Sequence, residues 1–345
     1  MSVLETLTPV IGTAAVAPAL LVLWLVVATD ERPVPPKLVW TAFLLGAASI
    51  LLLGLARAPF ARLLTVSDNP WLSLGLRSVF GVAAPEELVK ILVVIGISAR
   101  RRPFADPMDT VVYGAAVGLG FAAYENVVYL SAYPEMWRSL ALLRSVLTVP
   151  FHGALGIIAG AYIAIARSGG ALGAHRRGKD WARIRTVALV ALAPIGLHAS
   201  FDFPLLALKQ NPDVEGAMRL ALESAGMLIG FGTITLAARL VWRLGAHHAP
   251  RTEPSRAKLR QLRSLWGLLV AGGGAGFAGA VFVLTSIHHW LANPEKNIAL
   301  VLVPVGFVSI AIGAVLLLLA MGVYVLGRDR LQRAIADLPF ASGQG

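Results

Sequence analysis

The chain has 345 residues, of which 57% are hydrophobic and 14% charged, and its formal net charge is +11. Its mean hydropathy of +0.73 excludes an ordinary soluble protein, which could not bury so much apolar side chain. Apolar and polar residues do not alternate as they do in strands. The sequence therefore predicts an all-α fold, a polytopic transmembrane helix bundle.

The charge and the absence of cysteine exclude further classes of protein. Basic residues cluster in loops, whereas a nucleic-acid surface needs a contiguous basic face with aromatic residues, so we expect a lipid bilayer and no nucleic acid as partner. Without cysteine, disulfides and thiolate metal sites are excluded. The strong metal ligands that remain are histidine, aspartate and glutamate.

Long apolar runs follow one another along the chain, each near or above the roughly 20 residues that cross a bilayer core. They predict about nine spans in a single transmembrane domain, residues 1–345. The first run follows the acidic Glu5 and is long, which argues against a cleaved signal peptide. The runs are 9–29, 37–56, 74–99, 106–131, 138–166, 184–206, 216–242, 265–287 and 297–326.

Lysine and arginine concentrate in alternate loops of this arrangement. Cytoplasmic loops of membrane proteins are enriched in these residues. The pattern therefore predicts an N-terminus outside and a cytoplasmic C-terminus. The basic loops are 30–37, 100–105, 167–185, 243–263 and 327–333.

Pro85 interrupts the third run, 74–99. A proline within a span removes a backbone hydrogen bond and breaks or kinks the helix. We expect residues 71–84 to form an interfacial or re-entrant piece and Pro85 to lie near a helix N-terminus. There the carboxylates of Glu86 and Glu87 would be stabilised by the helix dipole.

Ionisable residues inside the apolar runs mark a functional site, because burying them in a membrane is costly. At about 1.5 Å rise per residue, five of them on four spans lie roughly 20 to 28 Å from their cytoplasmic ends. They would share one layer in the middle to outer half of the membrane. They are Glu86, Glu125, His152, His198 and Asp202.

The spacing of these residues favours a pocket. His198 and Asp202 are four residues apart, on one helical face between Pro194 and Pro204, where we expect a short helical piece. A carboxylate with histidines in such a pocket can bind a metal and its water, or can activate water directly as a general base. Both chemistries give hydrolysis.

Other polar residues have structural explanations. Glu87 and Lys90 are suited to a locked ion pair that orients Glu86, and we expect Arg144 to pair with one of the acids. Gly156 and Gly160 form a pair of small residues that permits close helix packing.

At these residues the sequence resembles the PrsW family of intramembrane proteases, within a larger group that includes CAAX prenyl endopeptidases and bacteriocin-immunity membrane proteins. The resemblance covers roughly residues 81–205, which we expect to be the catalytic core helices, with 1–70 and 207–345 as peripheral helices. The match rests on Glu86-Glu87-Leu88-Val89-Lys90, on residues 118–126 (Gly-Leu-Gly-Phe-Ala-Ala-Tyr-Glu-Asn), on His152 followed by small residues, and on His198 with Asp202.

The resemblance implies roles for these residues. Glu86, paired with Glu87 in the catalytic motif, would activate water, and Asp202 would orient His198 or take the role of an asparagine in the prenyl endopeptidase relatives. The prenyl endopeptidase relatives carry histidine where this chain has Glu125, and no His-Glu-x-x-His zinc motif is present. A metal-free glutamate mechanism therefore stays open beside Zn²⁺ or another divalent metal. The expected metal ligands or oxyanion stabilisers are Glu125, His152 and His198, and the expected orienting residues are Lys90, Asn126 and Arg144.

The resemblance further implies an intramembrane endopeptidase of the bacterial cytoplasmic membrane. It would cut a single-span membrane protein, similar to an anti-sigma factor, near its extracytoplasmic side in regulated intramembrane proteolysis. A non-catalytic scaffold or binding protein of the same fold is the alternative. A proton-coupled transporter ranks last, because no repeated halves are visible.

Overall fold

The computed structural model describes residues 9–30, 34–99, 106–167 and 179–248, and the single residues 315 and 318. Every element in this part of the chain is a helix, which confirms the all-α fold there. The chain divides into two units, Met1–Gly245 and Ala246–Gly345, and the contacts below belong to the first. The single domain with a core at 81–205 stays a prediction.

Six helical segments of the described residues are long and apolar enough to cross a membrane. They correspond to six of the predicted runs and identify an integral membrane protein. The third run is not among them, and the eighth and ninth lie outside the described residues apart from 315 and 318, so nine spans and their orientation stay predictions. The six segments are Pro9–Ala28, Pro36–Thr65, Pro107–Ala132, Trp137–Arg167, Ile184–Gln210 and Gly216–Val241.

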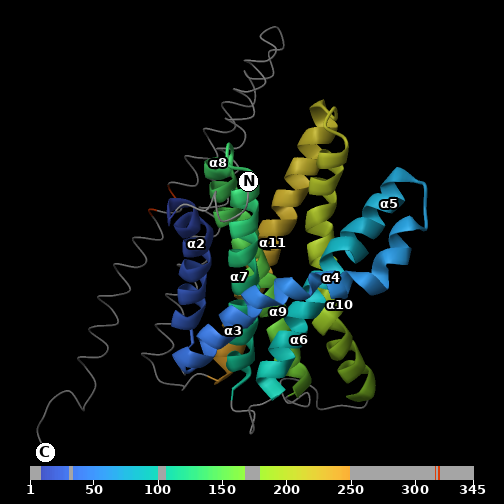
Figure 1. Cartoon of the computed structure of the whole chain (residues 1–345). Coiled ribbons are helices and arrows are strands. Elements are labelled where there is room, and N and C mark those ends of the chain that lie inside the picture. Colours follow the sequence, from blue (N-terminus) through green and yellow to red (C-terminus); the bar gives the residue numbers. More distant parts are fainter. Residues whose placement is uncertain are drawn as a thin grey trace, which may run out of the picture. The chain divides into compact units, whose positions relative to one another are not determined.

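Helix α7 (Pro107–Ala132) is the central element of the first unit (Figure 1). It packs against α9 (Val149–Arg167), α3 (Pro36–Ser49) and α2 (Pro9–Ala28). Residues 110–123 are all buried, as expected of a helix surrounded by other helices. The helix thus provides a rigid base for the polar residues that follow in its next turn.

Glycines let α7 and α9 approach closely. A Cβ atom on Gly114 would lie 2.0 Å from the carbonyl oxygen of Gly156, and one on Gly118 would lie 2.3 Å from that of His152. A Cβ on Gly160 would likewise lie 2.4 Å from the α7 backbone. The predicted close packing at Gly156 and Gly160 is confirmed, and it seats His152 directly against α7.

The predicted third run is helical but not regular. Helix α6 (Ala84–Ala99) has Pro85 in its first turn, as predicted, and follows the π-helix η3 (Arg77–Ala83) without a break. Because proline has no N–H, an irregular turn before it is expected. Before η3, helix α5 (Pro70–Leu76) pairs with the 3₁₀ segment η2 (Ala58–Thr65) in a hairpin beside the bundle (Figure 1).

Two further segments carry arginines of the polar site, Arg57 in the first and Arg144 in the second. Helix α3 continues through η1 (Ile50–Leu52) into α4 (Leu53–Arg57), which packs against α6. Helix α8 (Trp137–Leu143) runs into the π-helix η4 (Arg144–Thr148) and then into α9. A π-helical turn rotates the following residues relative to a regular helix, and such turns are frequent at functional sites.

Helix α10 (Lys179–Gln210) packs against α9, η3 and α6, and α11 (Gly216–His248) follows it. Pro194 and Pro204 both lie inside α10, so the predicted short piece between them is instead part of one continuous helix. Neighbouring helices make prolines tolerable within membrane helices.

Candidate active site

Glu87 is the centre of a buried ion-pair network contributed by α6 and α10. Its Oε1 lies 2.6 Å from the ammonium of Lys90 and 2.7 Å from Nδ1 of His198. Glu87 is 1% exposed and Lys90 2%, so solvent does not screen the pair. The predicted Glu87–Lys90 pair is confirmed. That it orients Glu86 stays a prediction, whereas Glu87 contacts His198 directly.

The contact with Glu87 fixes the orientation of the His198 ring. An ionised carboxylate only accepts hydrogen bonds, so Nδ1 of His198 donates to Glu87, and in a neutral ring Nε2 would carry no proton. Nε2 lies 3.4 Å from an oxygen of Asp202 and 4.0 Å from Oε2 of Glu86. A histidine held by a carboxylate in this way presents its second nitrogen to a metal or a reacting group.

His152 lies between the two halves of the polar cluster. Its Nδ1 is 3.3 Å from the Lys90 ammonium, and its Nε2 is 3.2 Å from Oε2 of Glu125. The ammonium can only donate and the carboxylate only accept, which makes Nε2 the protonated nitrogen of a neutral ring. The ring centroids of His152 and His198 are 5.1 Å apart, so both histidines border the same space.

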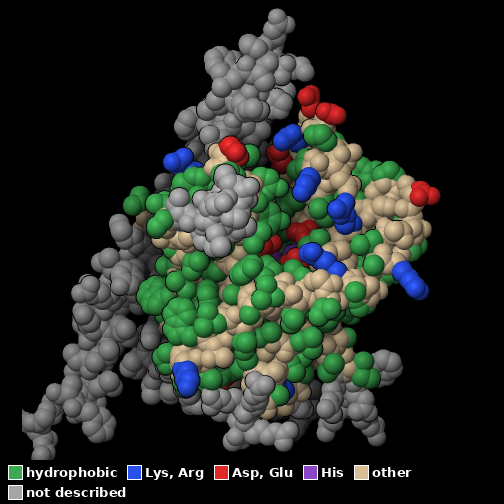
Figure 2. All heavy atoms as spheres, viewed as in Figure 1, with side chains coloured by type: hydrophobic (Ala, Val, Ile, Leu, Met, Phe, Trp, Pro, Cys, Tyr) green, Lys and Arg blue, Asp and Glu red, His purple; other side chains and the backbone are tan. Residues whose placement is uncertain are grey.

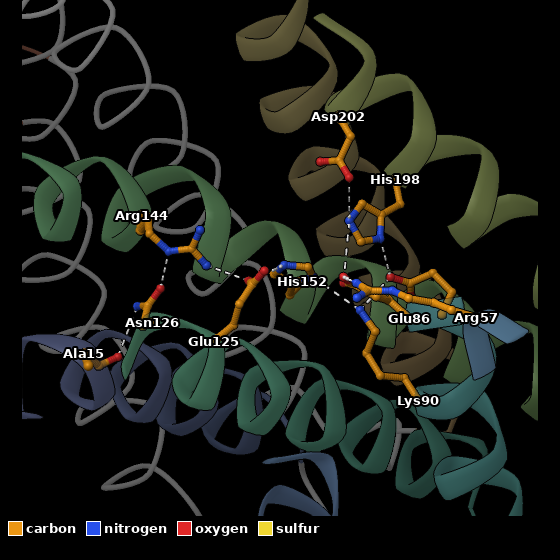
Figure 3. Close-up of polar contacts among 11 residues, drawn as sticks. Ala15, Arg57, Glu86, Lys90, Glu125, Asn126, Arg144, His152, His198 and Asp202 are labelled. Atoms are coloured by element: carbon orange, nitrogen blue, oxygen red, sulfur yellow. Dashed lines mark hydrogen bonds and ion pairs between the residues drawn. The ribbon is translucent and has the colours of Figure 1, made fainter. Parts of the chain in front are cut away.

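Glu125 belongs to a second ion pair. Its Oε2 accepts a hydrogen bond of 2.5 Å from the guanidinium of Arg144, whose Nε donates to Oδ1 of Asn126 at 2.5 Å. Asn126 in turn donates to the carbonyl oxygen of Ala15 on α2. The expected acidic partner of Arg144 is therefore Glu125. This chain of contacts links His152, through Glu125, to three helices (Figure 3).

Glu86 is the acid of this network that has a buried carboxylate oxygen without a hydrogen bond. The residue is 5% exposed, and its Oε2 is buried without a hydrogen-bond partner in the described part of the chain. Its Oε1 lies 3.7 Å from the guanidinium of Arg57, at the end of α4. An unpaired carboxylate oxygen is unfavourable in such surroundings, which marks this oxygen as a functional atom.

The residues Glu86, His152 and His198 form a buried group that could hold a divalent metal ion. One ligand atom from each lies within 4.8 Å of the others, and the described residues contain no other such group. The open Oε2 of Glu86 and the Nε2 of a neutral His198 suit this role, because imidazole and carboxylate are zinc ligands. His152 would have to exchange its contact with Lys90 or with Glu125 for the metal. Glu125, expected as the third ligand, instead contacts Arg144 and His152.

An open groove of about 340 Å³ lies beside this cluster. Figure 2 shows acidic side chains recessed in a hollow of the face that it draws. The hydroxyl of Ser78 donates to the carbonyl oxygen of Ala199 at 2.5 Å, which joins η3 to α10 next to His198. The lining residues of the groove are Gly75, Ser78, Val79, Ala199, Ser200 and Phe203.

All the site residues predicted from sequence meet in one network. Sequence reasoning missed Arg57, which stands at the end of an apolar run, where an arginine is typical of a loop. It also missed the π-helix that begins at Arg144, for which no local signal is known. The predicted residues in the network are Glu86, Glu87, Lys90, Glu125, Asn126, Arg144, His152, His198 and Asp202.

Comparisons with known proteins agree on one family. Residues 34–238, more than half of the chain, match the PrsW family intramembrane metalloproteases, and all of the network residues fall within this range. The proteins named Protease PrsW from three bacteria are similar to this chain. The relative from Oceanobacillus iheyensis is 29% identical over 193 residues, 56% of this chain and 81% of the relative.

The two other relatives cover different shares. The protein from Geobacillus kaustophilus is 29% identical over 216 residues, 62% of this chain and 88% of the relative. The protein from Bacillus subtilis is 38% identical over 105 residues, 30% of this chain and 43% of the relative. No solved structure matches the chain. The extent of the family match and the buried acid–histidine site agree that this chain belongs to the PrsW family of intramembrane metalloproteases.

Proposed function

We propose that this intramembrane protease hydrolyses a peptide bond of a single-span membrane protein near the extracytoplasmic face of the bacterial cytoplasmic membrane. In this proposal Glu86 takes the proton of the attacking water. The observation that carries it is the buried, unpaired Oε2 of Glu86 beside two histidines. An oxygen with no competing partner is available to a water molecule and to its proton.

The other residues of the network orient the site. Glu87 holds His198 so that Nε2 faces Glu86, and Asp202 contacts the same nitrogen from the next turn of α10. Arg144 fixes Glu125, whose carboxylate holds the His152 ring. Each reacting group is thus supported by a neighbour, an arrangement that active sites need in order to keep their geometry.

A divalent ion in the group formed by Glu86, His152 and His198 would polarise the scissile carbonyl and acidify water. The residues fit such an ion, because the Oε2 of Glu86 has no hydrogen-bond partner in the described part of the chain. In this arrangement Glu86 stands beside the ion as ligand or as proton acceptor, and Glu87 still determines which nitrogen His198 presents.

The position of the site in the chain supports a cut near the extracytoplasmic side. Glu86 and Pro85 lie in the first turn of α6, whose C-terminal end precedes the basic residues 100–102. If that basic segment is cytoplasmic, the site lies in the outer half of the membrane. Substrates similar to anti-sigma factors, cut in regulated intramembrane proteolysis, are the class that the family resemblance implies, and a cut in the outer half of the membrane is consistent with it.

Cleavage of single-span reporters tests the proposal. A library of reporters with a varied juxtamembrane segment on the extracytoplasmic side is co-expressed with the wild-type protein. We expect a released fragment from some reporters, and loss of cleavage by purified protein after chelation, restored by Zn²⁺. Metal analysis of wild type and His198→Ala is the matched control, because the variant should bind less metal.

The chelation result separates the two mechanisms that the residues allow. Cleavage that survives chelation with no metal detected would favour the metal-free glutamate mechanism. No fragment from any reporter, together with a correctly inserted protein, would favour the scaffold alternative.

The groove beside the cluster is expected to admit the substrate segment. A Cβ atom on Gly75 would meet no atom within 4 Å, so Gly75→Trp can fill the groove without displacing the backbone. We expect this change to lower reporter cleavage at least tenfold, through steric exclusion of substrate. Gly96→Trp is the control, because Gly96 also has nothing within 4 Å of a Cβ and lies elsewhere, exposed on α6. Equal cleavage by both variants would show that substrate does not use the groove.

A further inference from the structure

We propose that Arg57 is a catalytic residue whose guanidinium binds the carbonyl oxygen of the scissile peptide bond. The inference rests on the proposed proteolytic function and adds to it a cation that lies outside the motifs of the sequence. Its basis is the position of Arg57 between the buried Glu86 and the exterior of the bundle. The same group would stabilise the negative charge that develops on that oxygen during hydrolysis.

Arg57 reaches Glu86 from the end of α4, a separate element from those that carry the other polar residues. Figure 3 shows it beside Glu86, on the side of the cluster away from Glu125 and Arg144. Its guanidinium is 3.7 Å from Oε1 of Glu86, which is longer than a hydrogen bond, and its side chain is 49% exposed. Within the described residues this is its one ion pair.

The other two cations of the site, Lys90 and Arg144, each form a close ion pair with a largely buried carboxylate. The ammonium of Lys90 is 3% exposed and holds Glu87 at 2.6 Å. The guanidinium of Arg144 is 8% exposed and donates to both Glu125 and Asn126. Moving either one toward a substrate would leave a largely buried carboxylate without its cation. Arg57 alone among these three can turn to a substrate carbonyl and leave only a long, weak contact.

The distances suit the reaction. A water molecule held by Glu86 must attack a carbonyl carbon close to that carboxylate, and the carbonyl oxygen then lies within reach of a group 3.7 Å away. The new bond joins the water oxygen to the carbonyl carbon, the carbonyl π electrons move to its oxygen, and Glu86 takes the water proton. When the C–N bond breaks, Glu86 returns that proton to the leaving amine. Arg57 stays protonated throughout, because a guanidinium does not lose its proton in proteins.

Removal and chemical replacement of the guanidinium test this role. Using the reporter that the wild type cuts and the purified full chain, we expect Arg57→Ala to lower kcat about 100-fold or more with little change in KM. Guanidinium chloride at millimolar concentration should restore activity at least tenfold over sodium chloride at equal ionic strength. The half-exposed position of Arg57 gives the small ion access.

Two variants provide the controls. Arg62→Ala removes an exposed arginine of η2 that has no ion pair within the described residues, and it should leave kcat unchanged. Arg57→Lys should retain more activity than Arg57→Ala, because it keeps the charge but not the fork of donors. Thermal midpoints of all variants should match that of the wild type.

The opposing results are distinct. Arg57→Ala with activity within threefold of wild type, or above it, would overturn the inference and leave the proteolytic function standing. Activity lost together with a lowered thermal midpoint and no rescue by guanidinium would assign Arg57 a structural role and overturn the inference as well. Wild-type protein that cuts no reporter would overturn the proposed function and the inference together.

Discussion

Replacing Glu86 with glutamine is expected to lower reporter cleavage about a thousandfold or more, while the protein stays folded and membrane-inserted. Glutamine has nearly the same shape as glutamate but cannot take a proton from water. The residue is 5% exposed, and within the described residues its Oε2 has no hydrogen-bond partner and only a 4.0 Å contact with His198, so no strong contact is lost with the charge. The measurement is the initial rate of fragment release by wild type and variant at matched membrane levels.

The thermal midpoint gives this experiment a second readout. A buried, unpaired carboxylate is unfavourable, so Glu86→Gln should leave the midpoint unchanged or raise it. If the polar layer served packing alone, the midpoint would fall instead. Glu223→Gln is the matched control, since Glu223 pairs with Arg219 on α11 at a partly exposed position and should affect neither quantity. Cleavage retained by Glu86→Gln would remove Glu86 from the mechanism.

Much of this site could be predicted because membrane burial makes charged residues informative. A carboxylate or histidine inside an apolar run needs a partner or a function, so depth and helical spacing together were enough to group residues from four helices. The contact of His198 with Asp202 follows from their four-residue spacing. The pairing of Arg144 with an acid follows from the cost of an unpaired buried cation.

Helix rotation limited the prediction. Whether Glu86 or Glu125 shares a ligand group with the two histidines depends on the angle at which α6 and α7 face α9. That angle depends on how closely the backbones of α7 and α9 approach at their glycines. It also depends on the π-helices that precede α6 and α9. Spacing along one helix cannot reveal such contacts.

The contact of Arg57 with Glu86 could not be predicted either, because it too depends on how helices pack. Arg57 ends an apolar run, where arginine is common at a membrane surface, so its sequence context indicates a loop charge. Only the packing of α4 against α6 brings its side chain to Glu86. Likewise, the two prolines of α10 predict breaks that the packed helix does not show.

Replacing Lys90 with methionine is expected to lower the free energy of unfolding by about 3 to 5 kcal/mol. Lys90 is 2% exposed, its ammonium lies 2.6 Å from Glu87, and it also lies 4.3 Å from the ring centroid of Phe121. Methionine keeps most of the apolar contact but leaves the charge of Glu87 with His198 as its one remaining hydrogen-bond partner in the described residues. The measurement is reversible unfolding of purified protein in mixed micelles.

A double-mutant cycle separates the ion pair from packing. The variant Glu87→Gln with Lys90→Met should recover much of the lost stability, because it removes both charges, whereas cleavage should remain low since Glu87 no longer holds the His198 ring as a carboxylate. Lys37→Met, at an exposed position in the first turn of α3, is the control and should change stability little. A loss below about 1 kcal/mol for Lys90→Met would mean that the pair is hydrated in the bilayer. The buried network would then contribute to catalysis by orienting His198 and not by stabilising the helices around it.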